Sequence, residues 1–330
     1  MLPQNSLDPT SSILIIIVNY RTPQLTIDCL NSLVQEIQSL PETQVIVVDN
    51  DSGDRSVEQI QEAISTQNWS NWVSVIASNH NGGFAFGNNL AIRPILKSSS
   101  PPVYFLLLNP DTIVLSGAIK SLVDFMNQHP QVGIAGSRLE SPDGEVQHSA
   151  FRFHSIWSEL DRGLQLGVVT KLLSKWVVAP AIPTSQCQID WVSGASFLVR
   201  REVFESVGLM DEEYFMYYEE VDFCLQAKRM GWSCWYVPES RVIHLVGQSS
   251  GVDQPNTIPK RLPQYWFNSR RRYFIKNHGW WYAIVADFLW LVGFISWKIR
   301  SVLQKKSIHH PPHLLQDFWK NSVFVTRLTH

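Results

Sequence analysis

Two adjacent carboxylates, Glu219 and Glu220, stand behind a run of aromatic residues that begins at Tyr214, and Asp222 follows them. Apolar residues then recur at roughly helical spacing, and Gly231 can end the helix that they predict. The acids would therefore lie at a helix N-terminus, where the helix dipole stabilises negative charge. They also repel each other, and an aromatic wall would desolvate them, which suits a general base. This segment alone leaves helix cap and catalytic base equally open.

Another acid, Asp111, follows Asn109 and Pro110 at the end of an apolar run over 103–108. Proline stops a strand, so Asp111 would project from the edge of a sheet. One carboxylate, the phosphates of a ligand and several waters make a typical Mg²⁺ or Mn²⁺ site. A turn-forming aspartate is the plainer interpretation of the tripeptide taken alone.

Residues 81–89, Asn-Gly-Gly-Phe-Ala-Phe-Gly-Asn-Asn, form a glycine-rich segment that leads into a helix. Glycines let the backbone approach a ligand closely, and a helix N-terminus favours phosphate. The segment has neither the Gly-Lys-Ser/Thr of a Walker loop nor the dinucleotide Gly-X-Gly-X-X-Gly spacing, so a tight loop is the alternative. His244 follows a short strand over 235–242. Its imidazole could bind a metal or a phosphate, although a single histidine is more often structural.

The elements that would position these residues alternate along the first third of the chain. Strands are predicted over 12–18, 45–48, 72–77 and 103–108, and helices over 22–39, 56–65 and 88–97. This alternation is typical of an α/β fold whose parallel sheet has helices on both faces. Ligands of such sheets gather at the carboxyl ends of the strands. A polar cluster follows each strand, at 19–20, 49–51, 79–81 and 109–111.

Residues 130–190 are less regular. Asp143 and Gly144 predict a hairpin turn. We expect residues 155–185 to form a loop or a helical insertion over the site. The four cysteines show no Cys-X-X-Cys spacing, and residues 1–12 lack the basic start of a signal peptide, so we expect reduced thiols in a cytoplasmic protein.

Together these motifs resemble the inverting nucleotide-sugar glycosyltransferases of family 2, which have the GT-A fold, and most closely their rhamnosyltransferase-like branch. The resemblance covers about residues 12–250. It rests on short stretches in the same order along the chain, at 17–20, 47–52, 81–89, 107–112, 192–201, 207–211 and 218–222. It implies a GT-A catalytic domain over 1–254, with a mostly parallel, Rossmann-like sheet.

The resemblance also implies roles for individual residues. Asp111 would bind the Mg²⁺ or Mn²⁺ that bridges the donor diphosphate, and His244 would be a further metal or diphosphate ligand. The family more often has Asp at the position of Asn109. With Asn there, this chain has one carboxylate fewer for the metal. The residues that would bind the nucleotide sugar are Asn19, Tyr20, Asp49, Asn81, Gly83, Phe84, Asn88, Asn109, Trp191, Gly194 and Ala195.

Glu220 occupies the position of the family's base. The branch usually has Glu-Asp in this pair, with the second acid as the base, and the extra methylene of Glu220 moves its carboxylate outward. A shift of about 1 Å matters in a catalytic site, so Glu219 and Asp222 are rival bases. The expected reaction is a metal-dependent single displacement. It moves a sugar, with rhamnose as a guess, from a nucleoside diphosphate to a hydroxyl of a polysaccharide or lipid-linked glycan precursor.

Two other functions compete with this one. A sugar-phosphate nucleotidyltransferase would need a basic glycine-rich loop after the first strand, where the chain instead has Asn19, Tyr20, Arg21, Thr22 and Pro23. A catalytically inactive carbohydrate-binding or scaffold protein at a membrane would have no need of acids at both Asp111 and Glu220. The sequence therefore favours a glycosyltransferase.

Charge divides the chain into an acidic body and a basic tail. Residues 1–254 have 15 Lys and Arg against 27 Asp and Glu, whereas residues 255–330 have 12 against 2. A basic tail suggests an anionic surface, either nucleic acid or lipid. Six of the 13 tryptophans lie in this tail, which is typical of a membrane interface, so we expect no nucleic acid partner.

The apolar run 279–299 predicts a helix that lies in the membrane surface, because Asp287 would be costly at the centre of a bilayer. A helix packed on the body and a true membrane span are the alternatives. Arg270, Arg271 and Arg272 would bind lipid headgroups or the lipid diphosphate, or would form a solvated charged face. The expected location is the cytoplasmic face of the membrane, with 255–330 as a basic, Trp-rich helical region.

Overall fold

The computed structural model describes residues 12–245, 260–305 and 310–326. Its centre is a ten-stranded sheet whose main path runs β3-β2-β1-β4-β11-β6-β12-β5, and the first four of these strands are parallel. The strands of this path are β1 (Ile13–Asn19), β2 (Thr43–Asp49), β3 (Val73–Ala77), β4 (Tyr104–Leu108), β5 (Thr112–Val114), β6 (Val132–Glu140), β11 (Ser196–Arg200) and β12 (Ser233–His244). Four shorter strands are β7 (Val146–Gln147), β8 (Ala150–Phe151), β9 (Cys187–Ile189) and β10 (Trp191–Val192). Of these, β7 and β9 extend the sheet, and β8 pairs with β10 in a separate ribbon.

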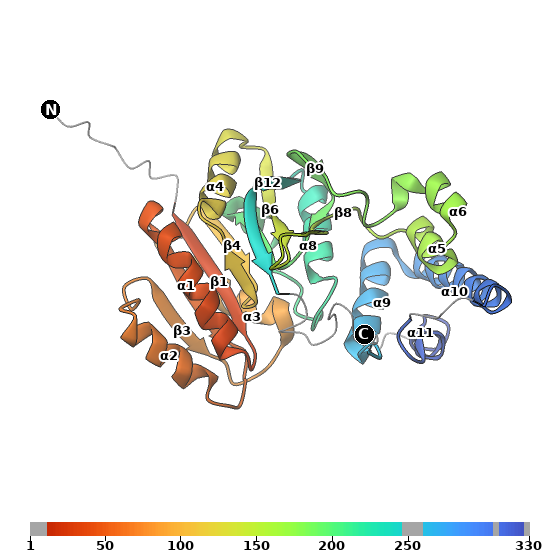
Figure 1. The fold of residues 1–330 in the computed structure, drawn as a ribbon, viewed down its shortest axis with the longest axis horizontal. Helices are drawn as coiled ribbons and strands as arrows, with labels where there is room; N and C mark the ends of the chain where they lie inside the picture. The colour runs from red at the N-terminus through yellow and green to blue at the C-terminus, as the bar shows by residue number, and fades with distance from the viewer. Residues whose placement is uncertain (1–11, 246–259, 306–309, 327–330) are drawn as a thin grey trace.

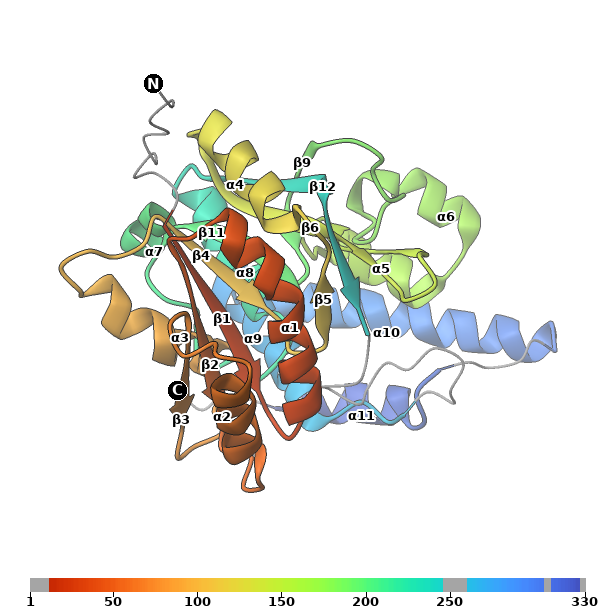
Figure 2. The same cartoon turned by 60° about the vertical axis from the view of Figure 1, so that its left-hand side comes forward.

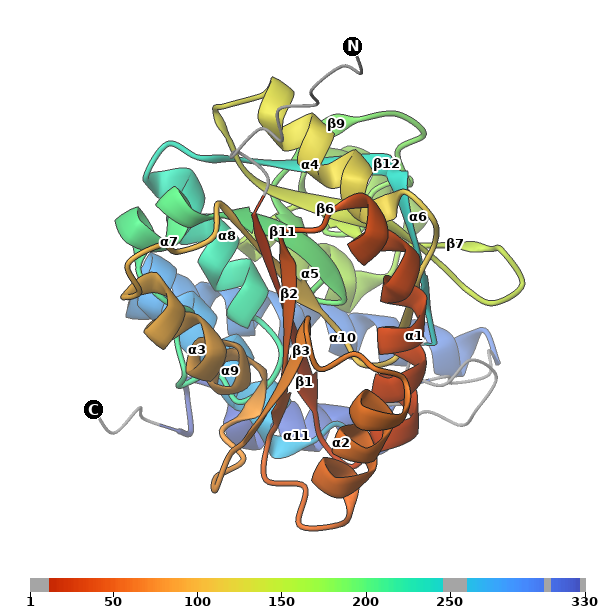
Figure 3. The same cartoon turned by 90° about the vertical axis from the view of Figure 1, so that its left-hand side faces the viewer.

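Helices cover both faces of the sheet, as the alternating sequence pattern predicts (Figure 3). One face packs against α1 (Pro23–Ser39), α2 (Ser56–Thr66) and α4 (Ala118–Gln128). The other packs against α3 (Gly83–Leu96), α7 (Arg201–Val207) and α8 (Glu219–Arg229). The continuous apolar run of β1 is explained by this arrangement, because its alternating side chains enter two separate cores.

The structure confirms the four predicted strands and the helices between them, with end shifts of a few residues. The largest shift is in α3, which begins at Gly83 inside the glycine-rich segment. The strand next to the end of the path, β12, continues through Pro238, and its register against β6 shifts between Val237 and Arg241. Proline removes one donor from the ladder, and that irregularity accommodates the loss.

The region after β12 contains α9 (Gln264–His278), α10 (Trp280–Leu303) and α11 (Leu314–Asn321). These helices lie at one end of the molecule, beside α5 (Ile156–Leu164) and α6 (Gly167–Leu172), which a 3₁₀ turn, Ser174–Trp176, follows (Figures 1 and 2). The predicted insertion over 155–185 is therefore largely helical. Two glycines let α5 and α10 touch. A Cβ on Gly163 would lie 2.6 Å from the Trp290 carbonyl oxygen, and one on Gly293 would lie 2.8 Å from the Leu164 nitrogen.

A buried ion-pair cluster joins α5, α9 and α10. The Arg270 guanidinium lies 2.7 Å from a carboxylate oxygen of Glu159 and 2.5 Å from one of Asp287. Arg271 is also buried, and it donates a hydrogen bond to the Asn321 carbonyl, while Arg272 forms an ion pair with Asp211. The prediction that these three arginines bind headgroups or form a solvated face is therefore wrong. Asp287, the acid that argued against a membrane span, is paired with Arg270 inside the protein.

The core does not stop at the predicted domain boundary at residue 254. Tyr273 and Phe274 of α9 and Ala283 of α10 belong to the same apolar cluster as α3 and α8. Within the described residues, α10 alone is long and apolar enough to cross a membrane. Of its most apolar 18-residue stretch, 39% is buried in the protein. All four cysteines are free thiols.

Candidate active site

A cavity of about 650 Å³, called here the strand-edge cavity, lies at the carboxyl ends of β1, β2 and β4. Most of the residues chosen from the sequence line it, although they come from six separate segments of the chain. They are Tyr20, Asn81, Gly83, Phe84, Asn109, Asp111, Trp191, Gly194, Ala195, Glu219, Glu220 and His244. The sheet edge that the polar clusters indicated is therefore hollow and lined by acids, amides and aromatic rings.

Strand pairing brings Asp111 and His244 together. The last residue of β12, His244, pairs with Thr112 at the start of β5, and the Leu245 amide donates to the Asp111 carbonyl. The His244 Nε2 atom consequently lies 3.5 Å from Asp111 Oδ1. The Asp111 side chain is almost fully buried and His244 is 15% exposed, so both face the cavity from its floor.

These two side chains fit a divalent cation that takes its remaining ligands from a substrate. Within the described ranges, no group of three or more His, Cys, Asp or Glu side chains could hold a metal ion together. A carboxylate and an imidazole leave most positions of a Mg²⁺ or Mn²⁺ ion for phosphate oxygens and water, as in sites that bind metal together with a phosphorylated ligand. The amide of Asn109 lines the same floor.

The acid pair begins α8, and the backbone before it is strained. Tyr217 and Tyr218 have φ angles of 69° and 71°, in the left-handed region that bulky side chains rarely adopt. Such a conformation costs about 1–3 kcal/mol for each residue and persists only where the surroundings enforce it. It turns the chain so that α8 starts at the cavity wall, with Glu219 and Glu220 both in the lining.

Burial raises the pKa of both glutamates, and the charge of one on the other separates them in acidity. Burial raises the pKa of Glu220 to about 7. Burial also raises the pKa of Glu219 well above its usual value, and the neighbouring charge of Glu220 adds to this rise. Each residue has one buried carboxylate oxygen, Oε2, without a hydrogen-bond partner. Because the charge on Glu220 opposes ionisation of Glu219, Glu220 is the member of the pair that can lose its proton and accept another.

Asp222, the third candidate base, has a different environment. Its carboxylate accepts hydrogen bonds from Lys276 Nζ at 2.7 Å and from Asn277 Nδ2 at 2.6 Å, both on α9. It is not among the residues that line the strand-edge cavity. Asp222 therefore ties α8 to α9, and the prediction that it is a rival base does not fit this geometry.

Three residues predicted to bind the nucleotide sugar lie beneath the cavity rather than in its lining. Asn19 donates to Asp49 at 2.7 Å, and Asp49 also accepts from Ser52 Oγ at 2.6 Å. Asn88 is buried and donates to the Phe84 carbonyl. These contacts fix the ends of β1 and β2 and the first turn of α3. They position the cavity wall, in which Asn50 and Tyr20 are lining residues; Tyr20 is exposed, whereas Asn50 is buried.

The glycine-rich segment is a docking element for the aromatic run. A Cβ on Gly83, whose φ is +84°, would lie 1.7 Å from the Phe215 carbonyl oxygen, so only glycine fits there. That oxygen accepts the Phe84 amide hydrogen, and Asn81 Oδ1 accepts the Gly83 amide hydrogen. Two donors at the start of α3 are therefore used inside the protein, which the prediction of a phosphate-binding turn did not foresee.

Sequence reasoning missed several lining residues. Asn50 and Phe215 lie within segments that it had singled out, so their neighbours could have indicated them. Ser193 and Phe151 lie beside the short β8-β10 ribbon, which has no clear pattern in the sequence. Tyr265 comes from α9, beyond the predicted end of the catalytic domain. The complete set of missed residues is Val18, Asn50, Pro110, Phe151, Ser193, Phe215, Met216, Tyr217 and Tyr265.

The chain is similar in sequence to known proteins. The family model described as glycosyl transferase family 2 matches residues 12–208. An N-acetylglucosaminyl-diphospho-decaprenol L-rhamnosyltransferase of Mycobacterium tuberculosis is 32% identical over 186 residues, which are 54% of this chain and only 58% of that protein. The dTDP-rhamnosyl transferase RfbF of Shigella flexneri is 25% identical over 274 residues, 81% of each chain.

A solved structure shows the same fold. The mannosyltransferase PcManGT from Pyrobaculum calidifontis, in complex with GDP-Man and Mn²⁺, superposes with a TM-score of 0.56 at 13% identity, over 91% of this chain and 78% of that one. Together with the mostly parallel sheet and its flanking helices, this likeness identifies the fold as GT-A. The family match covers more than half of the residues, so the chain belongs to glycosyl transferase family 2.

Proposed function

We propose that this chain is an inverting glycosyltransferase that moves a sugar from a nucleoside diphosphate donor to an acceptor hydroxyl. The observation that carries the proposal is the content of one cavity. An acid with a pKa of about 7, Glu220, shares it with the Asp111–His244 pair. A proton acceptor and a site for a leaving diphosphate are the two parts that a single displacement requires.

Glu220 takes the proton of the acceptor hydroxyl as that oxygen attacks the anomeric carbon. Its unpartnered Oε2 atom is free to accept this hydrogen bond. The charge on ionised Glu220 disfavours a second negative charge on Glu219, so the attacking oxygen meets one carboxylate. The backbone of Gly194 leaves room in front of the base, because a Cβ there would lie 3.9 Å from Glu220 Oε1 and 3.6 Å from the Phe84 ring.

Asp111 and His244 would hold Mg²⁺ or Mn²⁺ together with the donor diphosphate. A bound cation would supply charge neutralisation for the departing diphosphate. Asp111 and His244 would position the leaving group at the floor of the cavity, and they lie on different elements from Glu220, which is on α8. Donor and acceptor therefore approach from separate walls, which supports a single displacement with inversion.

The names of the relatives guide the choice of donor. Both curated relatives are named as rhamnosyl transferases, and one is named for dTDP-rhamnose. We therefore propose rhamnose on a thymidine or uridine diphosphate carrier, with a glycan or lipid-linked precursor as the acceptor. A panel of nucleotide sugars with Mn²⁺ or Mg²⁺ tests this directly. Slow hydrolysis of one donor would identify it, whereas no hydrolysis of any donor would favour a scaffold protein.

The decisive test of the mechanism is Glu220→Gln. We expect transfer to fall by about 10³-fold or more, with little change in donor affinity, because the amide cannot accept the proton. Glu219→Gln is the matched control, since the charge on Glu220 already disfavours ionisation of Glu219, and it should keep most of the activity. Full activity in Glu220→Gln would remove Glu220 from the role of base.

We also propose that the protein binds the cytoplasmic face of a membrane through the outward face of α10. Apolar side chains on this face are 41–80% exposed and recur every three or four residues, and Lys298 and Lys305 lie near its C-terminal end. Exposed apolar residues with flanking cations are typical of a helix that lies in a bilayer surface. The residues of the face are Trp281, Val285, Phe288, Val292, Ile295, Ile299 and Val302.

Sedimentation with anionic phospholipid vesicles tests this surface in the full chain. Phe288→Ser combined with Ile295→Ser should move most of the protein from the pellet to the supernatant. Met230→Ser is the control, because Met230 is 57% exposed but lies at the end of α8. If the double variant sediments like the wild type, α10 is not the contact, and a change in oligomeric state would instead indicate pairing between copies.

A further inference from the structure

Two more cavities continue from the strand-edge cavity on the far side of Glu220. The first, called here the α5 cavity, has a volume of about 580 Å³ and shares four lining residues with the strand-edge cavity, namely Phe151, Trp191, Tyr217 and Glu220. The second, called here the aromatic cavity, has a volume of about 300 Å³ and shares Arg162, Tyr217 and Trp266 with the α5 cavity. A path therefore leads from the base toward α10.

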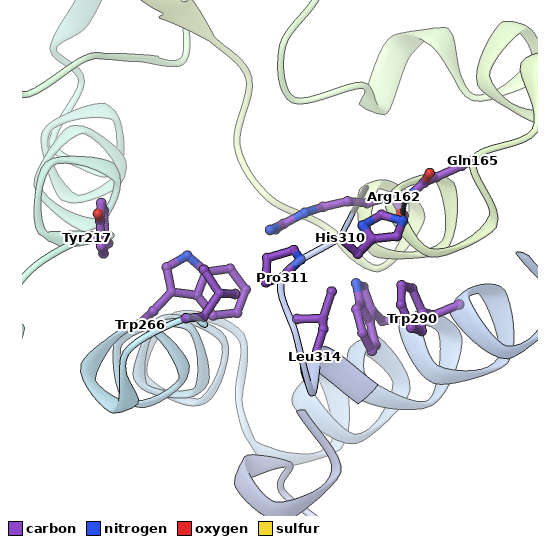
Figure 4. Close-up of a pocket in the computed structure, with 10 residues that line it drawn as sticks. Arg162, Gln165, Tyr217, Trp266, Trp290, His310, Pro311 and Leu314 are labelled. Carbon is purple, nitrogen blue, oxygen red and sulfur yellow. Dashed lines mark hydrogen bonds between the residues drawn. The ribbon is translucent and has the colours of Figure 1, made fainter. Parts of the chain in front are cut away.

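Arg162 stands where the α5 cavity meets the aromatic cavity. Its guanidinium lies over the Trp266 ring, with its central carbon 5.2 Å from the ring centroid. Figure 4 shows this side chain extending from α5 toward Trp266, with His310 and Pro311 beside it. The side chain is 42% exposed, so its planar group remains accessible to a ligand.

The charge on Arg162 is only weakly neutralised by the protein. Its carboxylate neighbour Glu159 lies 3.8 Å away, and the other oxygen of that carboxylate is 2.7 Å from Arg270. Asp161 also lines the α5 cavity and accepts a hydrogen bond from Thr170 at 2.6 Å. Burial lowers the pKa of His310, so that ring adds no charge near neutral pH. Arg162 is thus the one fixed cation among the described lining residues of both cavities.

Beyond Arg162, the aromatic cavity offers mostly apolar surface. Leu262, Trp290, Phe294 and Leu314 contribute to its walls, and Trp290 and Phe294 lie on the inner side of α10. The order along the path is therefore a proton acceptor, then a cation, then an apolar chamber. A ligand that matches this order has a hydroxyl, then an anionic group, then a hydrocarbon chain.

We propose that Arg162 binds the phosphate of an amphiphilic acceptor whose hydrocarbon chain enters the aromatic cavity while its sugar hydroxyl reaches Glu220. The inference rests on the proposed function, and it assigns the acceptor site to α5 and the C-terminal helices. A guanidinium in a stacked, partly desolvated position is suited to bidentate phosphate binding. Trp266 contributes a cation–π contact to the guanidinium, and Tyr217 lines all three cavities along the path.

The test is a calorimetric titration of the full chain with three probes, without divalent metal and below the micelle concentration. The probes are farnesyl diphosphate, inorganic pyrophosphate and farnesol. We expect farnesyl diphosphate to bind about tenfold or more tightly than either of the others, because it alone satisfies both Arg162 and the apolar chamber. Arg162→Gln should weaken its binding by about tenfold or more, and Arg162→Lys by less.

Lys171→Gln is the matched control, since Lys171 is an exposed cation on the same insertion that lines neither cavity. Unchanged farnesyl diphosphate binding in Arg162→Gln would overturn the proposal. So would pyrophosphate binding that equals that of farnesyl diphosphate and depends on Asp111, because the anion would then occupy the strand-edge cavity.

Donor hydrolysis, measured on the same preparations, separates this inference from the proposed function. If the wild type hydrolyses a nucleotide sugar and Arg162→Gln binds farnesyl diphosphate normally, only the acceptor assignment fails. If no donor is hydrolysed but farnesyl diphosphate binding depends on Arg162, the site for a lipid phosphate stands and the transferase proposal fails.

Discussion

Two regions of this molecule bury a pair of carboxylates, and they do so with opposite results. At the start of α8, Glu219 and Glu220 face a cavity in which no described residue places a cation beside them, and burial raises the pKa of both. At the junction of α5, α9 and α10, burial would also raise the pKa of Glu159. The charges there, chiefly that of Arg270, outweigh burial and lower it.

The difference shows that burial alone does not distinguish a catalytic acid from a structural one. The partner decides. A paired acid stabilises the fold while ionised, whereas an unpaired acid costs stability once it ionises and can act as a base instead. Loss of charge should therefore change the free energy of unfolding in opposite directions in the two regions.

The largest expected effect is that of Arg270→Met, which leaves Glu159 and Asp287 buried without their cation. Removing one partner of a buried ion pair costs about 3–5 kcal/mol, so the free energy of unfolding should fall by that amount. Chemical denaturation measures it. Arg272→Met is the control, because its pair with Asp211 is partly exposed, and it should cost about 1 kcal/mol. Equal losses in the two variants would contradict the special position of Arg270.

Glu220→Gln should have the opposite sign and stabilise the protein at pH 8. The pKa of Glu220 is about 7 in the folded chain, whereas its ordinary value, which applies to the unfolded chain, is 4.5. Ionising Glu220 is therefore less favourable in the folded chain. The gain should be about 2 kcal/mol after allowance for the partial exposure of the side chain. It should shrink as pH falls and vanish below about 4.5, where both states hold the proton. A constant difference across pH would point to packing instead of charge.

Transfer activity should rise with pH through about 7, because only ionised Glu220 accepts the acceptor proton. Below that value, kcat/KM should fall by about tenfold for each pH unit, which corresponds to about 1.4 kcal/mol. A pH profile with the donor at a fixed saturating level measures this. In Glu219→Gln the midpoint should change little, since Glu220 ionises before Glu219 does. A profile that stays flat from pH 5 to 8 would exclude Glu220.

Asp222→Asn should have the smallest effect. It removes the contact with Lys276, which keeps its second partner Asp211 at 2.7 Å, so we expect a loss of about 1 kcal/mol in unfolding free energy. Activity should stay within a few-fold of the wild type. A loss as large as that of Glu220→Gln would restore Asp222 as a base and break the distinction between paired and unpaired acids.

The parallel half of the fold could be predicted from the sequence, because β1, β2 and β4 are buried on both faces and appear as continuous apolar runs. The site at their carboxyl ends followed from that prediction. That Asn50 rather than Asp49 lines the cavity did not follow, because only the turn geometry decides which side chain faces it. Similarly, Gly83 is required by a carbonyl from a segment more than a hundred residues away.

The second half of the molecule was less predictable because its partners are distant in sequence. Arg270 looks like part of a basic surface run, and only the approach of α5 and α10 reveals Glu159 and Asp287 around it. The apolar run of α10 shows the same limitation. Its composition indicates a membrane helix, whereas its inner face fills the space beside α5 and its outer face alone is available to lipid.

This arrangement constrains how the enzyme can be shortened for study. A chain that ends before α10 would lack Asp287 and the Trp290 face, so it would leave Arg270 half-neutralised and would uncover the Gly163 contact on α5. Loss of membrane binding in such a chain could not be told from misfolding. A soluble form should instead keep all its helices and receive polar residues on the outward face of α10. The same design would keep the chamber beside Arg162 intact for crystallisation with ligands.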